Sequence, residues 1–210
     1  GSRTGVFAGI SGMDYAAAHL HSGDLDLVDA YSVTGIAFST LSGRVSYLFG
    51  FEGPSMAIDT ACSSSLVSLH LAIQSLRRKE CDLALVGGVN LMLNPEIHVG
   101  FSKLKGISRD GKCKTFSRDA DGHGRGEGCG VVVLRRLSDA RCQGDSIRGV
   151  VRGSAVNQDG RSAGFTAPNG QSQERVIREA LADSGVTPES VGYVEAHGTG
   201  TTLGDPIEVD

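Results

Sequence analysis

The chain has 210 residues, of which 40% are apolar, 5% aromatic and 21% charged, which is enough for one core of ordinary size or two small halves sharing one. Twenty Lys and Arg against 24 Asp and Glu leave a formal net charge of −4, which argues against nucleic acid as the main partner. No apolar run approaches the roughly 18 residues that a membrane helix needs, which argues against a membrane protein.

Glycine is over-represented, with 30 residues and no fixed period, which indicates many tight turns and fits an enzyme scaffold. Five cysteines without a C-x-x-C pair argue against a disulfide framework and a paired-thiolate zinc site, and favour reduced thiols in the cytoplasm. The first five residues lack the basic and apolar regions of a signal peptide, no initiator Met is present, and the sequence stops directly after a motif-rich stretch, so we expect a fragment.

The first half of the chain predicts strands alternating with helices. In chain order we expect a strand at Thr4–Ile10, a helical pattern with a glycine break at Ser39–Phe51, a short strand through Met56 and Ile58, a helix at Ser63–Lys79, and a strand buried on both faces at Asp82–Val89. The helix at 63–79 is predicted to bury the face that carries Leu66, Leu69, Ile73 and Leu76.

The second half shows the same strand–helix–strand order after a long irregular stretch. We expect irregular structure at Asn90–Gly130, a strand at Val131–Leu137, a boundary between two halves at Ser138–Asp145, a second α/β pattern from Ile147–Ala155 onward, a helix at Gln171–Ser184, and a strand at Val191–Ala196. Alternating strands and helices predict an α/β fold with mainly parallel sheets.

Cys62 is the candidate nucleophile. It lies between the strand that ends near Asp59 and the helix that begins near Ser63, so it is placed at a helix N-terminus, where backbone N–H groups favour a thiolate and could stabilise an oxyanion. A buried structural cysteine is the alternative. Cys81, Cys113, Cys129 and Cys142 lack this context and are interpreted as structural.

His197 follows the strand Val191–Ala196 in a glycine-rich loop, the position where open α/β sheets bind ligands. It could polarise a carbonyl or relay a proton, and the hydroxyls of Thr199 and Thr201 suit an amide-bearing ligand. A core hydrogen bond for the histidine and turn chemistry for the threonines are the alternatives. No metal site is expected, because the remaining histidines show no ligand spacing: His19, His21, His70, His98 and His123.

The alternating glycines of 122–130 fit neither a dinucleotide fingerprint nor a phosphate loop. They are interpreted as close backbone packing beside a site, with Glu127 as a candidate buried, hydrogen-bonding carboxylate in a supporting role; an exposed loop glutamate is the alternative.

Four stretches resemble the β-ketoacyl synthase family, in its order. Asp59-Thr60-Ala61-Cys62-Ser63-Ser64-Ser65-Leu66 is similar to the active-site cysteine signature, and Val194–Pro206 is similar to the first histidine motif. Between them, Gly153–Gly160 and Thr166–Gly170 resemble the ketosynthase domains of modular (type I) polyketide synthases.

The resemblance implies an incomplete thiolase-like fold with layered α-β-α-β-α architecture. Residues 1–140 would belong to the N-terminal half, which carries the cysteine, and 141–210 would begin the C-terminal half, which carries the histidine. Cys62 would accept the acyl chain, His197 would support decarboxylation of a malonyl-type extender, and Thr199 and Thr201 would contact phosphopantetheine.

The expected partners are acyl carrier protein domains bearing acyl and malonyl-type thioesters on phosphopantetheine, with no bound cofactor and a homodimer in the full domain. The family's later lysine and second histidine motif are not among these residues, so we expect no condensation by the chain alone. A cysteine-dependent thioester hydrolase and a non-catalytic condensing-fold scaffold are the alternatives. Release of free acid from an acyl thioester would favour the hydrolase, and failure of Cys62 to become acylated would favour the scaffold.

Overall fold

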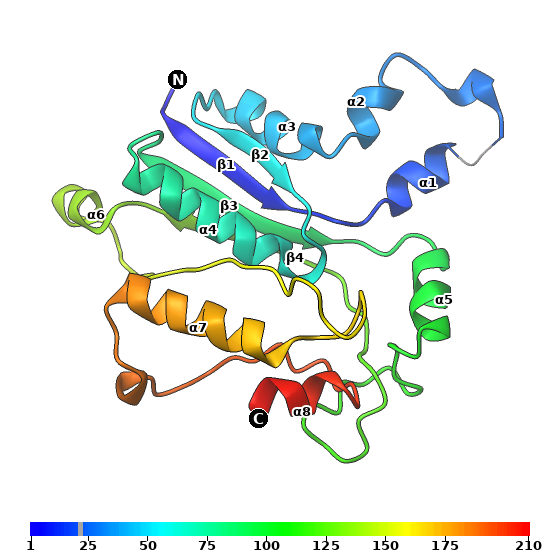
Figure 1. Cartoon of the computed structure of the whole chain (residues 1–210). Coiled ribbons are helices and arrows are strands. Elements are labelled where there is room, and N and C mark those ends of the chain that lie inside the picture. Colours follow the sequence, from blue (N-terminus) through cyan, green and yellow to red (C-terminus); the bar gives the residue numbers. More distant parts are fainter. Residues whose placement is uncertain (21–22) are drawn as a thin grey trace. The chain divides into compact units, whose positions relative to one another are not determined.

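The computed structural model describes residues 1–20 and 23–210 (Figure 1). Contacts divide them into two compact units: the first unit comprises residues 1–94 and 126–150, and the second unit comprises 95–125 and 151–210. The first unit contains β1 (Thr4–Gly9), α1 (Asp14–Leu20), α2 (Ser32–Ile36), α3 (Ser39–Phe49), β2 (Ser55–Ile58), α4 (Ser64–Arg77), β3 (Leu83–Asn90), β4 (Gly128–Leu134) and α6 (Leu137–Gln143). The second contains α5 (Glu96–Lys103), α7 (Gly170–Ser184) and α8 (Gly204–Val209).

The first unit is built on a four-stranded sheet of order β2-β1-β3-β4. β1 pairs in parallel with both β2 and β3, whereas β4 runs antiparallel to β3. The predicted α/β class with mainly parallel pairing is therefore confirmed. Because β1, β2 and β3 are parallel, their carboxyl ends share one edge of the sheet, which is the edge that leads to Cys62.

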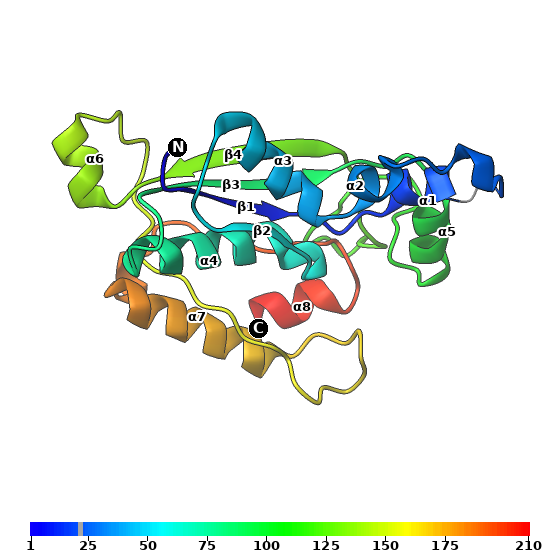
Figure 2. The same ribbon diagram turned by 90° about the horizontal axis from the view of Figure 1, so that it is seen from above.

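Helices α3 and α4 cover the two faces of this sheet (Figure 2). The chain moves from β1 outward to β2 through α3 and then back across β1 to β3 through α4, and right-handed crossovers in opposite directions place the two helices on opposite faces. The core lies under α4 and consists of Phe7, Ala72, Leu76, Cys81, Ala84 and Val86.

The buried face of α4 differs from the predicted one. Leu66 is 69% exposed, and the buried side chains of the helix are Ser64, Ser68, Ala72, Ile73, Ser75 and Leu76. The sheet presents Gly9 and Gly88 to the start of this helix, and the close approach selects small residues there. The leucine pattern predicted the helix correctly. Of its predicted buried face, only Ile73 and Leu76 are buried.

Other predictions for the first unit need correction. The glycine break predicted in Ser39–Phe51 is found at the end of α3, where Gly50 adopts the left-handed conformation (φ 65°), and Gly43 lies within the helix. β3 buries only Ala84 and Val86, and its other residues are half-buried or, at Asn90, exposed, so the strand is not buried on both faces. The stretch 90–130 contains helix α5, β4 ends at Leu134, and the polar stretch 138–145 belongs largely to helix α6.

In the second unit, helix α7 confirms the prediction for Gln171–Ser184. Asn169 caps it by accepting from the N–H of Ser172, and Gly185 ends it at φ 64°. No strand forms at 147–155 or at 191–196 in the described part of the chain, contrary to expectation. A strand persists through its hydrogen-bonded neighbours, and the described residues supply no ladder partner for either segment.

Candidate functional site

Cys62 lies in a single helical turn, Ala61–Ser63, that directly precedes α4 and follows β2. The side chain is exposed, and the predicted position at a helix start is confirmed. Ala61 adopts φ 55°, a left-handed conformation that costs a non-glycine residue about 1–3 kcal/mol. Strain of this kind persists only where the surrounding contacts hold it.

Short polar side chains supply those contacts. Asp59 accepts a hydrogen bond from the N–H of Ala61 (3.0 Å). The buried hydroxyl of Ser64 accepts from the N–H of Thr60 (2.9 Å) and donates to the carbonyl of Ala61 (2.7 Å). The backbone on both sides of Cys62 is therefore fixed by local hydrogen bonds.

Two glycines determine how deep this turn sits on the sheet. A Cβ on Gly9 of β1 would lie 2.7 Å from the backbone nitrogen of Ser65, and a Cβ on Gly88 of β3 would lie 2.8 Å from the Cβ of Ser65. Both distances are too short for real side chains, so only glycine admits the first turn of α4 at this depth. The N-terminus of a 14-residue helix is thereby brought to Cys62.

His197 is exposed in the loop that precedes α8, and two carboxylates of α8 hold that loop. Glu208 accepts hydrogen bonds from the backbone N–H groups of His197 and Gly198, the second at 2.8 Å. Asp205, which is 4% exposed, accepts from the N–H of Gly200 (2.9 Å). The sequence analysis assigned no role to either carboxylate. The available signal was an acidic residue five positions beyond Gly200, within the histidine motif, and another eight positions beyond Gly200, just after it.

The hydroxyls of Thr199 and Thr201 lie 2.9 Å apart and share one hydrogen bond. Thr201 also accepts from the N–H of Gly204 (3.1 Å). Two hydroxyls sharing one bond retain one further O–H to donate. The pair therefore takes part in the turn, which is one of the two roles that the sequence left open. The other role, hydrogen bonding to a ligand, stays a prediction.

Cys62 belongs to the first unit and His197 to the second. The structure describes each within its own unit, and their convergence in one site stays a prediction.

Glu127 is exposed rather than buried, which corrects the expectation. Its carboxylate does form a hydrogen bond, accepting from the N–H of Met92 (2.6 Å), because the chain enters β4 beside the exit of β3. Of the neighbouring glycines, Gly122 and Gly124 show the predicted close backbone packing, whereas Gly126, Gly128 and Gly130 have open space where a Cβ would stand.

The other cysteines divide into two groups. Cys81 is completely buried in the core, as a structural residue would be. Cys113, Cys129 and Cys142 are exposed, and their interpretation as structural residues stays a prediction. Cys113 has a local role, since its sulfur accepts from the N–H of Gly124 (3.3 Å).

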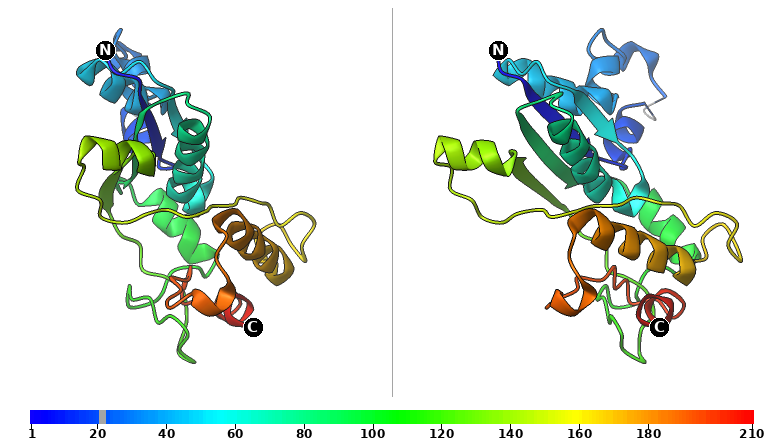
Figure 3. Two further views of the ribbon diagram at one scale, coloured as in Figure 1. Left: turned by 90° about the vertical axis from the view of Figure 1, so that its left-hand side faces the viewer. Right: turned by 60° about the vertical axis from the view of Figure 1, so that its left-hand side comes forward.

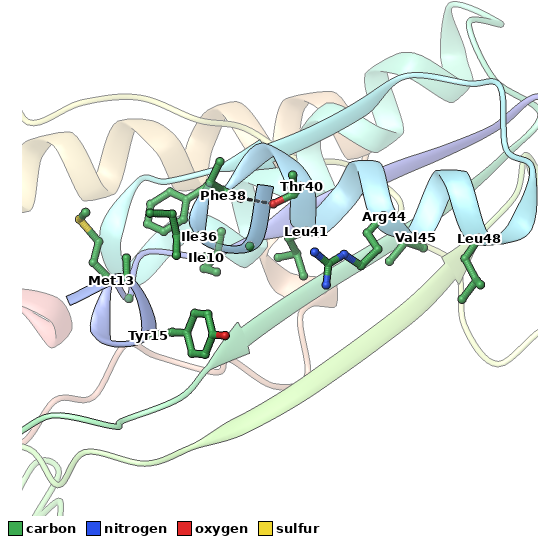
Figure 4. A pocket seen from close by; sticks show the side chains of 14 residues that line it. Ile10, Met13, Tyr15, Ile36, Phe38, Thr40, Leu41, Arg44, Val45 and Leu48 are labelled. Carbon is green, nitrogen blue, oxygen red and sulfur yellow. Dashed lines mark hydrogen bonds between the residues drawn. The ribbon is translucent and has the colours of Figure 1, made fainter. Parts of the chain in front are cut away.

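An open pocket of about 400 Å³ lies among α1, α2 and α3 of the first unit (Figure 4). Its walls are mainly apolar and include Tyr15, Phe38, Leu41 and Leu48, with the guanidinium of Arg44 as a polar group. Arg44 donates to the carbonyl of Thr34 (3.3 Å). None of the motif residues lines this pocket.

Neither metal ligation nor membrane insertion finds support in the described residues. Among residues 1–20 and 23–210, no three His, Cys, Asp or Glu side chains are grouped as a metal would require; His21 lies outside the described residues. No helix in the same ranges is both long and apolar enough to span a bilayer.

Family models match nearly the whole chain. The N-terminal domain of β-ketoacyl synthases matches residues 1–140, and the C-terminal domain of the same enzymes matches residues 148–210. The chain belongs to the β-ketoacyl synthase family. Within it, the similarity is to ketosynthases of modular type I polyketide synthases.

Individual relatives agree with this. The chain is 57% identical over 208 residues to polyketide synthase GfsA of Streptomyces halstedii, covering 99% of the chain and 3% of that protein. It is 56% identical to erythronolide synthase EryA2 of Saccharopolyspora erythraea, covering 99% of the chain and 6% of that protein.

A solved ketosynthase from module 6 of the bacillaene synthase of Bacillus subtilis 168 is 43% identical, with a TM-score of 0.89. The match covers 99% of the chain and 35% of that structure. The chain therefore has the mixed α/β fold of a ketosynthase, over about one third of such a domain's length.

Proposed function

We propose that these residues supply the acyl-accepting cysteine and one catalytic histidine of a ketosynthase that condenses polyketide chains. The observation that carries the proposal is the exposed Cys62 in a strained turn at the start of α4. The amino end of the helix favours the thiolate, the form that attacks a thioester.

In the first step, the Cys62 thiolate attacks the carbonyl of an acyl thioester carried on phosphopantetheine. The new S–C bond forms as the C–S bond to the carrier breaks, and the phosphopantetheine sulfur leaves as a thiolate with that electron pair and then takes up a proton. N–H groups at the start of α4 would stabilise the oxyanion that develops on the carbonyl.

In the second step, a malonyl-type extender on an acyl carrier protein loses CO2, and the electron pair of the broken C–C bond moves onto the extender's thioester oxygen. His197 would stabilise that oxygen, and Thr199 or Thr201 would bond the amides of the phosphopantetheine arm. The resulting carbanion attacks the acyl group on Cys62, forms the C–C bond, and releases the cysteine thiolate.

The organisation follows from the same proposal. Residues 1–140 belong to the N-terminal half of the ketosynthase and 141–210 to the beginning of its C-terminal half, a division supported by the two family models. The partners are acyl carrier protein domains and, in the full domain, a second copy. Five cysteines, an odd number without a C-x-x-C pair, favour reduced thiols and so support a cytoplasmic location.

The test uses a complete ketosynthase domain that carries these residues. Cys62→Ala should abolish loading from an acyl thioester, whereas Cys142→Ala, which removes another exposed thiol, should load normally. His197→Ala should slow release of CO2 from the malonyl carrier thioester by about 100-fold or more while loading of Cys62 continues. Normal loading of the Cys62→Ala domain would refute the proposal.

A further inference from the structure

One buried carboxylate connects the His197 loop to a second loop far away in the sequence. Asp205, 4% exposed, uses both of its oxygens: one accepts from the N–H of Gly200 (2.9 Å), and the other accepts from the N–H of Phe116 (2.6 Å). A buried carboxylate requires such partners, and here both donors are backbone groups. Asp205 is therefore bonded to two loops at once, within the second unit.

The partner loop is strained at the point of contact. Phe116 adopts φ 57°, which is rare for a bulky side chain and persists only where neighbours impose it. Its N–H is the group that Asp205 holds. Next to it, the hydroxyl of Thr115 donates to the carbonyl of Gly198 (2.6 Å). Thr115 therefore bonds to the His197 loop directly, and Phe116 bonds to it through Asp205.

The two loops are also in direct steric contact. A Cβ on Gly198 would lie 2.7 Å from the methyl carbon of Thr115, and a Cβ on Gly200 would lie 3.0 Å from the carbonyl oxygen of Gly122. The N–H of Gly122 donates to the carbonyl of Gly200 (2.9 Å). Figure 3 shows the segment around residues 115–122, in green, running beside α8, in red.

Residues 108–122, which we call the brace, are tied together by charge. The ammonium of Lys114 lies 2.9 Å from Asp110 and 2.7 Å from Asp121. The buried hydroxyl of Ser108 donates to the same oxygen of Asp110 (2.7 Å). The brace thus has internal contacts of its own in addition to those with the His197 loop.

We propose that Asp205 is a positioning residue for the ketosynthase reaction, which couples the His197–Thr201 loop to the brace and so fixes the imidazole and the threonine hydroxyls for decarboxylation. Asp205 touches neither substrate nor reacting atoms. Its effect passes through Gly200 on one side and Phe116 on the other. The inference rests on the proposed role of His197.

The test compares two Asp→Asn changes in a complete ketosynthase domain. In Asp205→Asn one acceptor oxygen becomes an NH2 group that faces a backbone N–H, so one of the two loop contacts is lost. We expect CO2 release to slow by about 10–100-fold while acylation of Cys62 stays within about twofold, because small misplacements cost that much. The control Asp119→Asn alters an exposed carboxylate of the brace and should change neither rate.

Thr115→Val provides a second test if Asp205→Asn does not fold. It removes the single O–H that bonds Gly198, and we expect CO2 release to slow by about 3–10-fold. The matched control is Thr202→Val, at an exposed threonine outside the bonded pair. Equal loss of acylation and decarboxylation in Asp205→Asn, or unchanged decarboxylation, would overturn the positioning role.

Amide hydrogen exchange separates this proposal from the proposed function. In Asp205→Asn, exchange should rise together in peptides covering 114–118 and 197–201, with no such rise in Asp119→Asn. A rise confined to one loop would overturn the coupling even if catalysis falls. If His197→Ala leaves decarboxylation unchanged in the unaltered background, the proposed function fails, and the exchange result still decides the coupling.

Discussion

The Cα of Gly88 faces Ser65 so closely that a Cβ added to the glycine would lie 2.8 Å from the Cβ of the serine. Gly88 is on β3, and Ser65 is in the first turn of the helix that follows Cys62. The depth of the turn that carries Cys62 therefore depends on a missing side chain 26 residues away (88 − 62).

Gly88→Ala should move the first turn of α4 away from the sheet. We expect a loss of about 1–3 kcal/mol in the free energy of unfolding, because added volume in a packed contact forces backbone shifts. Alkylation of Cys62 by iodoacetamide should slow as the helix start moves. Gly43→Ala, at a helical glycine with open space around it, should leave stability unchanged or raise it by up to about 1 kcal/mol. Denaturant unfolding and timed mass spectrometry measure both effects.

Cys62 should be the first thiol modified by limiting iodoacetamide in the folded protein. Exposure alone does not distinguish it, because Cys113, Cys129 and Cys142 are also exposed. The distinguishing feature is the amino end of α4, which favours the thiolate. Peptide mapping by mass spectrometry gives the order of labelling. Preferential labelling of Cys142 or of the buried Cys81 would remove the assignment.

Arg136 should be a costly charged residue to remove from the first unit. Its guanidinium donates to the carbonyls of Leu76 (3.0 Å) and Cys81 (2.8 Å) and pairs with Asp82 (2.6 Å) and Asp139 (2.7 Å). The side chain is only 21% exposed, so Arg136→Ala should lower the free energy of unfolding by about 2–3 kcal/mol.

Arg136→Lys should recover only part of this loss, since an ammonium cannot reproduce the planar fork of donors. Arg141→Ala, on the exposed side of α6, should change stability by less than about 0.5 kcal/mol. Urea unfolding of the three variants provides the comparison, and equal effects at both positions would contradict the expectation.

The brace should keep its ion pairs over a wide pH range. The Ser108 hydroxyl and the Lys114 ammonium lower the pKa of Asp110 below its ordinary value of 3.8, and Lys114 also lowers the pKa of Asp121. Pairing with Asp121 and Asp110 raises the pKa of Lys114 above 10.5. The two carboxylates contribute their full stabilisation of the folded brace above their ordinary pKa, and this stabilisation is lost as pH falls through their lowered pKa values. Lys114 contributes its full stabilisation below pH 10.5, and this stabilisation is lost as pH rises through its raised pKa.

Hydrogen exchange of peptides from the brace, corrected for the intrinsic pH dependence, should therefore show constant protection from about pH 4 to 10 and a loss on either side. Lys114→Met should remove this plateau and leave less protection throughout. A loss of protection near pH 6 in the unaltered protein would show that a histidine, and not this ion-pair group, controls the brace.

The linear sequence determined those features that depend on neighbouring residues. The apolar run before Gly9, the periodicity of α4 and α7, and the glycine that ends α7 all encode local structure, so their elements form where the pattern places them. The motif around Cys62 likewise fixed its place between a strand and a helix, because the turn is held by contacts among Asp59, Thr60 and Ser64.

Tertiary structure decided what depends on distant partners. The segment 191–196 has the composition of a strand, yet no described strand lies beside it to complete a ladder. Leu66 fits an apolar stripe but is exposed, since Gly9 and Gly88 bring the sheet so close that serines occupy the buried side of α4. Asp205 reads as one polar residue in a motif, and only the return of the chain to Phe116, 89 positions earlier, makes its carboxylate a link between two loops.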